Sequence, residues 1–322
     1  MGSRCSVWGA VSISLAILGL PGMASGQASS QPASRPAAQA QARQVDTAYP
    51  GLACGALTYA TLADLPAGTL LESGTVRLTE ADLSSEMAKA PAEVRDQLAK
   101  NSFFFLEQVA AQKVILDLAR REAGEATADG ASQPERELMR AHFEKLTQGV
   151  KVTDAEVKDF YENNKDLCGG APLNQMKDQI EQYVLQQKEK AVTDEYVRTL
   201  GQRVPIRVSA DWTAKHAVLA RDNPVDKARF SGKPSMVDFG ASGCRPCDMM
   251  APILKTLEKK YEGKANIVFV HVREQQVLGA RYGVEAIPTQ VFFDKGGREV
   301  YRHTGFYPQA EIENHLAKMG VK

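Results

Sequence analysis

The stretch from residue 238 to residue 261 reads DFGASGCRPCDMMAPILKTLEKKY, with Cys244 and Cys247 two residues apart in front of an amphipathic run. Strand-like and helix-like segments alternate around it, and the last two strands flank a Gly-Gly turn. This alternation predicts an α/β domain over residues 213–322, with helices on both faces of one sheet.

A Cys-x-x-Cys pair can bind a metal, form a structural disulfide or exchange disulfides with a substrate. A zinc site needs further ligands, and the sequence has no second Cys-x-x-Cys. A structural bridge would close too small a loop to stabilise the fold much. Redox exchange fits best, because free N–H groups and the helix dipole would stabilise a Cys244 thiolate, with the charge of Arg245 beside it. We expect neither a metal nor another cofactor.

Asp238 lies six residues before Cys244 in an otherwise apolar run. If the carboxyl is buried there, its pKa should be raised. It could then accept the proton of Cys247 through a water. The alternative is an exposed Asp at a strand edge.

The segments VDFGASGCRPCDMMAPILKTLEKKYEGK and RYGVEAIPTQVFFDKGGREVYRHTGF resemble thioredoxins in their whole order. The resemblance implies a thioredoxin fold for this domain. It implies that Cys244 is the nucleophilic cysteine, Cys247 the resolving cysteine and Asp238 the buried acid. It also implies a helix-kinking proline at Pro252 and a cis-proline at Pro288 that faces the disulfide, and it places the glycine of the last strand at Gly305.

The same resemblance implies where a substrate binds. A cis bond at Pro288 would expose the backbone of Ile287 to pair with an extended segment, next to Arg245 and Pro246. Three residues depart from the family: Gly243 replaces the usual Trp, Arg245 the usual Gly, and Phe269 the Lys that commonly pairs with the acid.

The Arg-Pro pair between the cysteines bears on the direction of electron flow. Pro246 has no N–H to offer a thiolate, which favours a reducing protein, whereas the charge of Arg245 acts in the opposite sense. On balance the sequence favours a reductase or isomerase over an oxidase.

The N-terminus has the pattern of a secretory signal peptide. Arg4 precedes an uncharged apolar run from Val7 to Leu20, and small residues follow. We expect residues 1–26 to be cleaved, which would make the protein periplasmic. Residues 27–48 are rich in Gln, Ala, Ser and Pro and predict a flexible linker.

Residues 49–212 predict a mostly helical domain. Thr79 and Thr153 are predicted N-caps, and an extended segment at 69–76 could pair with 203–208. The phrases LTEADLSSEM, VTDAEVKDFYENNKDL and LNQMKDQIEQYVLQQKEKAVTDEYVRTL resemble the helical chaperone segment of SurA-type, parvulin-associated periplasmic foldases, without the prolyl-isomerase domain. The resemblance implies binding of unfolded polypeptide; a scaffold or homodimerisation module is the alternative.

Cys54 and Cys168 remain once the Cys-x-x-Cys pair is set aside. In an oxidising compartment two lone thiols should not persist, so we expect a disulfide between them. The alternatives are a bridge between two subunits or a second redox thiol at Cys54.

The chain has 39 basic and 39 acidic residues, so its net charge gives no indication of nucleic-acid binding. The sequence thus predicts an exported thiol–disulfide oxidoreductase that acts on unfolded or disulfide-bearing exported proteins and draws electrons from a membrane donor. The alternative is a non-enzymatic holdase chaperone with a thioredoxin-fold docking module.

Overall fold

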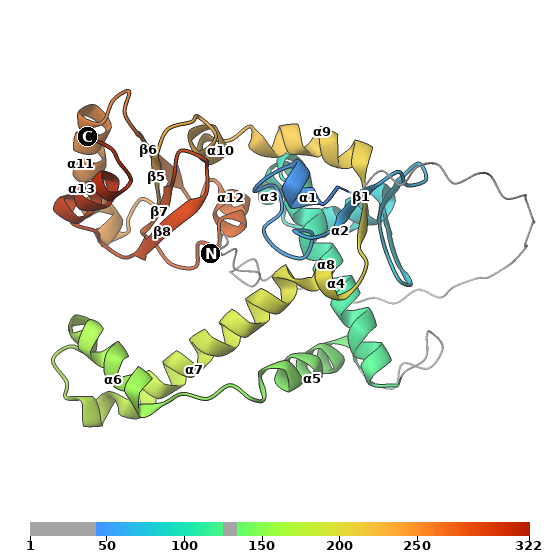
Figure 1. Ribbon diagram of the computed structural model, residues 1–322, viewed down its shortest axis with the longest axis horizontal. Helices are drawn as coiled ribbons and strands as arrows, with labels where there is room; N and C mark the ends of the chain where they lie inside the picture. The colour runs from blue at the N-terminus through green and yellow to red at the C-terminus, as the bar shows by residue number, and fades with distance from the viewer. Residues whose placement is uncertain (1–42, 125–133) are drawn as a thin grey trace, which may run out of the picture.

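The computed structural model describes residues 43–124 and 134–322, which form two parts (Figure 1). The predicted signal peptide and all of the predicted linker up to residue 42 lie outside the described residues. Among those described, no helix is both long enough and apolar enough to cross a membrane.

The N-terminal part contains a four-stranded sheet as well as helices. Its elements are α1 (Val45–Ala48), β1 (Thr61–Ala63), β2 (Thr69–Ser73), β3 (Val76–Thr79), α2 (Glu80–Ala88), α3 (Ala92–Lys100), α4 (Ser102–Glu122), α5 (Glu135–Thr147), α6 (Asp154–Asn163), η1 (Lys165–Cys168), α7 (Leu173–Arg198), α8 (Leu200–Arg203), β4 (Arg207–Ser209) and α9 (Ala210–Arg221). The strand order is β1-β4-β2-β3, with β1 and β4 parallel and the other pairs antiparallel.

This sheet both confirms and corrects the sequence predictions. The expected pairing of the two segments is present, with Leu71 opposite Val208. The mostly helical description was too simple, because β1 and β3 complete a mixed sheet. Both predicted N-caps are confirmed: the Thr79 and Thr153 side chains each accept a bond from the third residue of their helix, in capping boxes.

The predicted linker ends earlier than expected. Val45 is fully buried in the N-terminal core, and its N–H donates to the carbonyl of Ala60 at 2.9 Å. The N–H of Leu62 donates to the carbonyl of Arg43. Residues 43–48 are therefore structured, because one apolar side chain and a pair of strand-like hydrogen bonds anchor them to the sheet.

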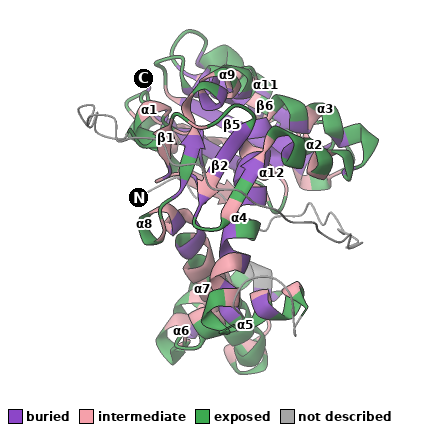
Figure 2. Ribbon diagram, turned by 90° about the vertical axis from the view of Figure 1, so that its right-hand side faces the viewer, coloured by how far each residue is buried: buried purple, intermediate pink, exposed green. Residues whose placement is uncertain are grey.

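Helices α5, α6 and α7 form an arm that projects from the body of the protein (Figures 1 and 2). The far end of the arm has its own small core, in which Val157, Cys168 and Ile180 are buried. Figure 2 shows that the remaining arm surface is largely exposed or half-buried.

The C-terminal part is a sheet covered by helices on both faces, as predicted. It comprises α10 (Pro224–Arg229), β5 (Ser235–Gly240), α11 (Arg245–Lys260), β6 (Asn266–His271), α12 (Gln276–Arg281), β7 (Thr289–Phe293), β8 (Glu299–Thr304) and α13 (Gln309–Lys318). The strand order is β6-β5-β7-β8, with β5 and β6 parallel and the others antiparallel. Helices α11 and α13 pack with Met236 and Phe292, whereas α10 and α12 pack with Val237 and Phe239.

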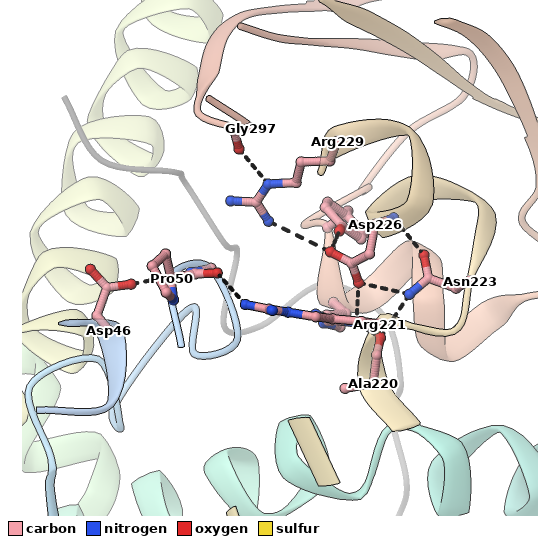
Figure 3. Close-up of polar contacts among 11 residues, drawn as sticks. Asp46, Pro50, Ala220, Arg221, Asn223, Asp226, Arg229 and Gly297 are labelled. Atoms are coloured by element: carbon pink, nitrogen blue, oxygen red, sulfur yellow. Dashed lines mark hydrogen bonds and ion pairs between the residues drawn. The ribbon is translucent and has the colours of Figure 1, made fainter. Parts of the chain in front are cut away.

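The two parts are joined by more than the chain connection. Figure 3 shows the buried carboxylate of Asp226, in α10, among its partners. Arg281 bonds this carboxylate at 2.9 Å and also donates to the carbonyl of Ala220 at the end of α9. Arg221 donates to the carbonyl of Pro50 in the N-terminal part. Val277 of α12 belongs to the N-terminal hydrophobic core, so the parts share apolar and polar contacts.

Candidate active site

Cys244 and Cys247 form a disulfide at the start of α11, with sulfur atoms 2.18 Å apart. Cys244 is the N-cap residue in extended conformation, and Cys247 lies one turn into the helix. Cys247 is buried, whereas Cys244 is half-buried. The unpaired N–H groups of the first helical turn face the Cys244 end, where they favour a thiolate. The geometry thus gives the two cysteines unequal access to a substrate.

The loop between β5 and α11 holds Cys244 in place. Gly243 has φ +75°, a left-handed conformation that glycine adopts readily. The ring of His271, at the end of β6, accepts a hydrogen bond from the backbone N–H of Ser242 at 3.1 Å. This histidine was not singled out from the sequence, because only the sheet brings it beside a loop 29 residues earlier.

The cis-proline loop faces the disulfide. The Ile287–Pro288 peptide bond is cis, as predicted, and the carbonyl oxygen of Ile287 lies 3.9 Å from the sulfur of Cys244. The N–H of Gly305, in the loop after β8, donates to the carbonyl of Pro288 at 2.8 Å. Ile287 is half-buried, so its backbone remains near the surface next to the sulfur.

The two residues between the cysteines lie at the mouth of the site. Arg245 is exposed and is the first residue of α11, and Pro246 follows it in the first turn. Both therefore border the side from which a substrate would reach Cys244. This position agrees with the substrate contacts that the sequence predicts for them, which remain a prediction.

Asp238 is fully buried in β5, between β6 and β7. Burial raises the pKa of its carboxyl to about 6, against the effect of a hydrogen bond from Gln290. The Nε2 of Gln290 donates to Oδ1 of Asp238 at 2.7 Å, while Oδ2 has no hydrogen-bond partner among the described residues. The predicted burial is confirmed and the exposed-edge alternative is wrong, and the direction of the pKa shift is the one predicted.

Gln290 is a second residue that sequence reasoning missed. It lies in TQVFF, a strand whose other residues are nearly all suited to a core, so a polar amide there was an available signal. The side chain is completely buried. Phe269, noted above for replacing a lysine, is the β6 residue opposite Asp238 and is 48% exposed.

The structure does not form the predicted disulfide between Cys54 and Cys168. The thiol of Cys54 donates to Oε2 of Glu107 at 3.3 Å, and the Cys54 N–H bonds the same oxygen. Cys168 is instead buried in the core of the arm, with Val157 and Ile180. The prediction failed because pairing by elimination counts cysteines and takes no account of the distance between them.

The arm reaches the loop that leads to Pro288. Lys190 of α7 pairs with Glu285, three residues before Pro288, at 3.1 Å, and with Asp194 at 2.8 Å. On the body side of the arm, His142 is buried and bonds the hydroxyl of Tyr196 at 2.9 Å. This contact gives His142 a structural role in joining α5 to α7. Across residues 43–124 and 134–322, no group of three or more His, Cys, Asp or Glu side chains could hold a metal ion.

A comparison with known proteins matches the C-terminal part to one family. The family described as Thioredoxin matches residues 217–318. Thioredoxin 1 of Nostoc sp. is 36% identical over 108 residues, which are 34% of this chain and 91% of that protein. The thioredoxin of Alicyclobacillus acidocaldarius is 38% identical over 85 residues, covering 26% of this chain and 80% of that protein. Thioredoxin NaTrxh of Nicotiana alata, a solved structure, aligns with a TM-score of 0.27 and 30% identity, over 30% of this chain and 80% of its own.

Proposed function

The chain belongs to the thioredoxin family and is an oxidoreductase with a Cys-x-x-Cys active-site pair, and from this premise we propose that it reduces or isomerises disulfides in other exported proteins. The observation that carries the proposal is the position of the Cys244 sulfur, half-buried and 3.9 Å from the carbonyl of Ile287. An extended polypeptide that pairs with this carbonyl would bring its own disulfide to the sulfur.

The reaction begins from the reduced enzyme. The thiolate of Cys244 attacks one sulfur of the substrate disulfide, the substrate S–S bond breaks, and a mixed disulfide forms. Cys247 then loses its proton to Asp238 and attacks the sulfur of Cys244. The substrate leaves as its second thiolate and takes up a proton, so the substrate is reduced and the two cysteines end as the disulfide.

Regeneration of the reduced enzyme requires a dithiol donor, which we place at the membrane. Pro246 offers no N–H to the Cys244 thiolate, so the reduced form gains less stabilisation than a free backbone donor would give. Arg245 acts against this effect through its charge. The balance supports net reduction or isomerisation rather than oxidation.

We propose that the N-terminal part binds the unfolded client, as its resemblance to the SurA-type helical segment implies. The ion pair between Lys190 and Glu285 supports this role, because it places α7 next to the loop that precedes Pro288. The signal-like N-terminus supports export to the periplasm, where disulfide-bearing clients occur. Homodimerisation through the same helices is the alternative role for this part.

A second candidate function is a holdase that needs no redox chemistry. One observation favours it: Tyr183 of α7 is 48% exposed and contacts the ring of Phe160, with ring centroids 5.1 Å apart. An exposed tyrosine beside a half-buried phenylalanine on a projecting arm suits contact with unfolded chains.

Two assays separate the candidates. With dithiothreitol as reductant, the protein should accelerate reduction of the insulin disulfides, and Cys244→Ser should abolish this acceleration. A chain with both active-site cysteines replaced by Ser should still suppress aggregation of a reduced client if the arm binds it. If the Cys244→Ser variant reduced insulin as fast as the parent protein, the oxidoreductase proposal would be wrong.

A further inference from the structure

Asp238 and Gln290 face each other directly across β5 and β7. They are register partners in an antiparallel pair, so their side chains lie on the same face of the sheet. Both side chains are completely buried. The 2.7 Å bond from Gln290 Nε2 to Asp238 Oδ1 is thus shielded from water. In such surroundings a hydrogen bond to a charged oxygen is strong.

The other neighbouring strand, β6, places no polar side chain directly opposite Asp238. Its register partner on β6 is Phe269. Two residues further along β6, His271 bonds Ser242 and pairs with Glu274, and Cys247 of α11 lies beside Gly240. Among the described residues no cation makes an ion pair with the Asp238 carboxyl, and Gln290 is the one side chain that lowers its pKa.

Gly240 shows what lies between the acid and the resolving cysteine. A Cβ added there would stand 3.4 Å from the Cβ of Cys247 and 3.5 Å from Oδ2 of Asp238. The same point is 2.9 Å from a ring carbon of Phe269. Asp238 Oδ2 and Cys247 therefore border one small space, which the phenylalanine ring closes on the β6 side.

We propose that Gln290 is a positioning residue for the resolving step: its amide holds Oδ1 of Asp238, so that Oδ2 is turned toward Cys247 and receives its proton. The inference rests on the proposed function, in which Cys247 must be deprotonated before it attacks Cys244. The ring of Phe269, which is 48% exposed, borders the same space on the β6 side. The acid thus takes its one polar contact from β7 rather than from a cation on β6.

The test follows the two steps separately with a small disulfide, dithiobis-nitrobenzoate. In reduced protein with Cys54 and Cys168 replaced by Ala, attack by Cys244 releases a first nitrothiobenzoate and attack by Cys247 releases a second. Gln290→Met keeps the length of the side chain and removes its donor. The rate of the second phase should fall at low pH, where Asp238 is protonated; this fall is the acid limb of the pH profile. Loss of a bond of this kind should move the acid limb up by about one pH unit, which slows the second phase about tenfold at pH 5. The first phase should not change.

A second variant and a control keep the test independent of damage to the fold. Phe269→Lys puts a cation opposite Asp238, so it should move the acid limb to lower pH and, combined with Gln290→Met, restore the parent profile. Ser235→Ala removes another buried hydrogen bond from β5, far from Cys247, and should leave the profile unchanged.

The outcomes separate the inference from the proposed function. An acid limb that stays in place in Gln290→Met, or both phases slowed equally at every pH, would overturn the positioning role. A shifted limb together with failure to reduce insulin would support the role of Gln290 while removing protein disulfides as the substrate.

Discussion

Replacing Asp238 by Asn should stabilise the oxidised protein above pH 6 and change its stability little near pH 4. The carboxyl is fully buried and has one hydrogen bond, from Gln290, which Asn can accept with its own Oδ1. Asn cannot ionise, so the variant avoids the cost of holding a charge at this position.

The sign follows from proton linkage. Burial raises the pKa of Asp238 from 3.8 to about 6 in the folded protein. Between these values the folded state keeps a proton that the unfolded state has released, so the stability of the parent protein falls as the pH rises through this window. Above pH 6 the full penalty applies. A shift of this size corresponds to about 3 kcal/mol, and the gain should be somewhat smaller because the amide N–H₂ of Asn finds no acceptor in place of Oδ2.

Hydrogen exchange is the suitable measurement. The chain has two tryptophans, Trp8 and Trp212, and neither lies in the C-terminal part, so their fluorescence does not report on it. Exchange of β5 and β7 peptides in increasing urea gives the opening free energy of this sheet in the full chain. Exchange must be compared at pH 4 and at pH 8, after correction for the intrinsic rate.

Asp294 provides a matched control, in which the effect of pH on stability has the opposite sign. Against the effect of burial, hydrogen bonds from Arg298 and Gly296 hold the pKa of Asp294 below its usual value. Its stabilisation is present near neutral pH and is lost as the pH falls through the folded pKa, so Asp294→Asn should destabilise the sheet at pH 8. If Asp238→Asn and the parent differed by the same amount at pH 4 and pH 8, or if the variant were less stable at pH 8, the argument from burial would be refuted.

Three further predictions concern the site, the arm and the N-terminal core. Cys247→Ser should accumulate mixed disulfides with clients on non-reducing gels, whereas Cys244→Ser should accumulate none; equal trapping by both would contradict the assignment. Lys190→Ala should slow reduction of protein disulfides severalfold and leave reduction of a small disulfide unchanged. Lys188→Ala on the same helix serves as the control. An equal effect on both substrates would contradict a role of the arm in binding protein substrates. Glu107→Gln should destabilise the N-terminal part by about 1–3 kcal/mol in thermal unfolding, because this one carboxyl group accepts bonds from three backbone N–H groups, two of them in fully buried bonds; an unchanged midpoint would contradict this.

Local sequence signals predicted what depends on neighbouring residues. The Cys-x-x-Cys pair before an amphipathic run placed the disulfide at a helix start, and the charge of Asp238 within an apolar strand indicated a buried acid. Capping residues at Thr79 and Thr153 marked two helix starts correctly. Each of these features involves residues within a few positions of each other, where spacing alone fixes the geometry.

Features that depend on strand register or on tertiary contacts were not predictable in this way. Gln290 lies 52 residues from Asp238, and only the pairing of β5 with β7 makes them neighbours. The three residues of β1 are too few to show a period, so the mixed sheet was underestimated. The thiol of Cys54 bonds the carboxyl group of Glu107, 53 residues away, and a count of the cysteines could not predict this contact.

The ion pair between Lys190 of the arm and Glu285, in the loop before Pro288, would link the two parts of the chain in the proposed function. If α7 binds the client, as we propose, the client would be kept near the loop that contains Ile287 and Pro288, because Lys190 ties the helix to Glu285. Binding at one site then raises the effective concentration of the client's disulfide at the other, with no new contact at the sulfur itself. This advantage applies to a polypeptide long enough to reach both sites and gives nothing to a small disulfide. The ratio of the two activities therefore measures the contribution of the arm, separately from the chemistry of Cys244.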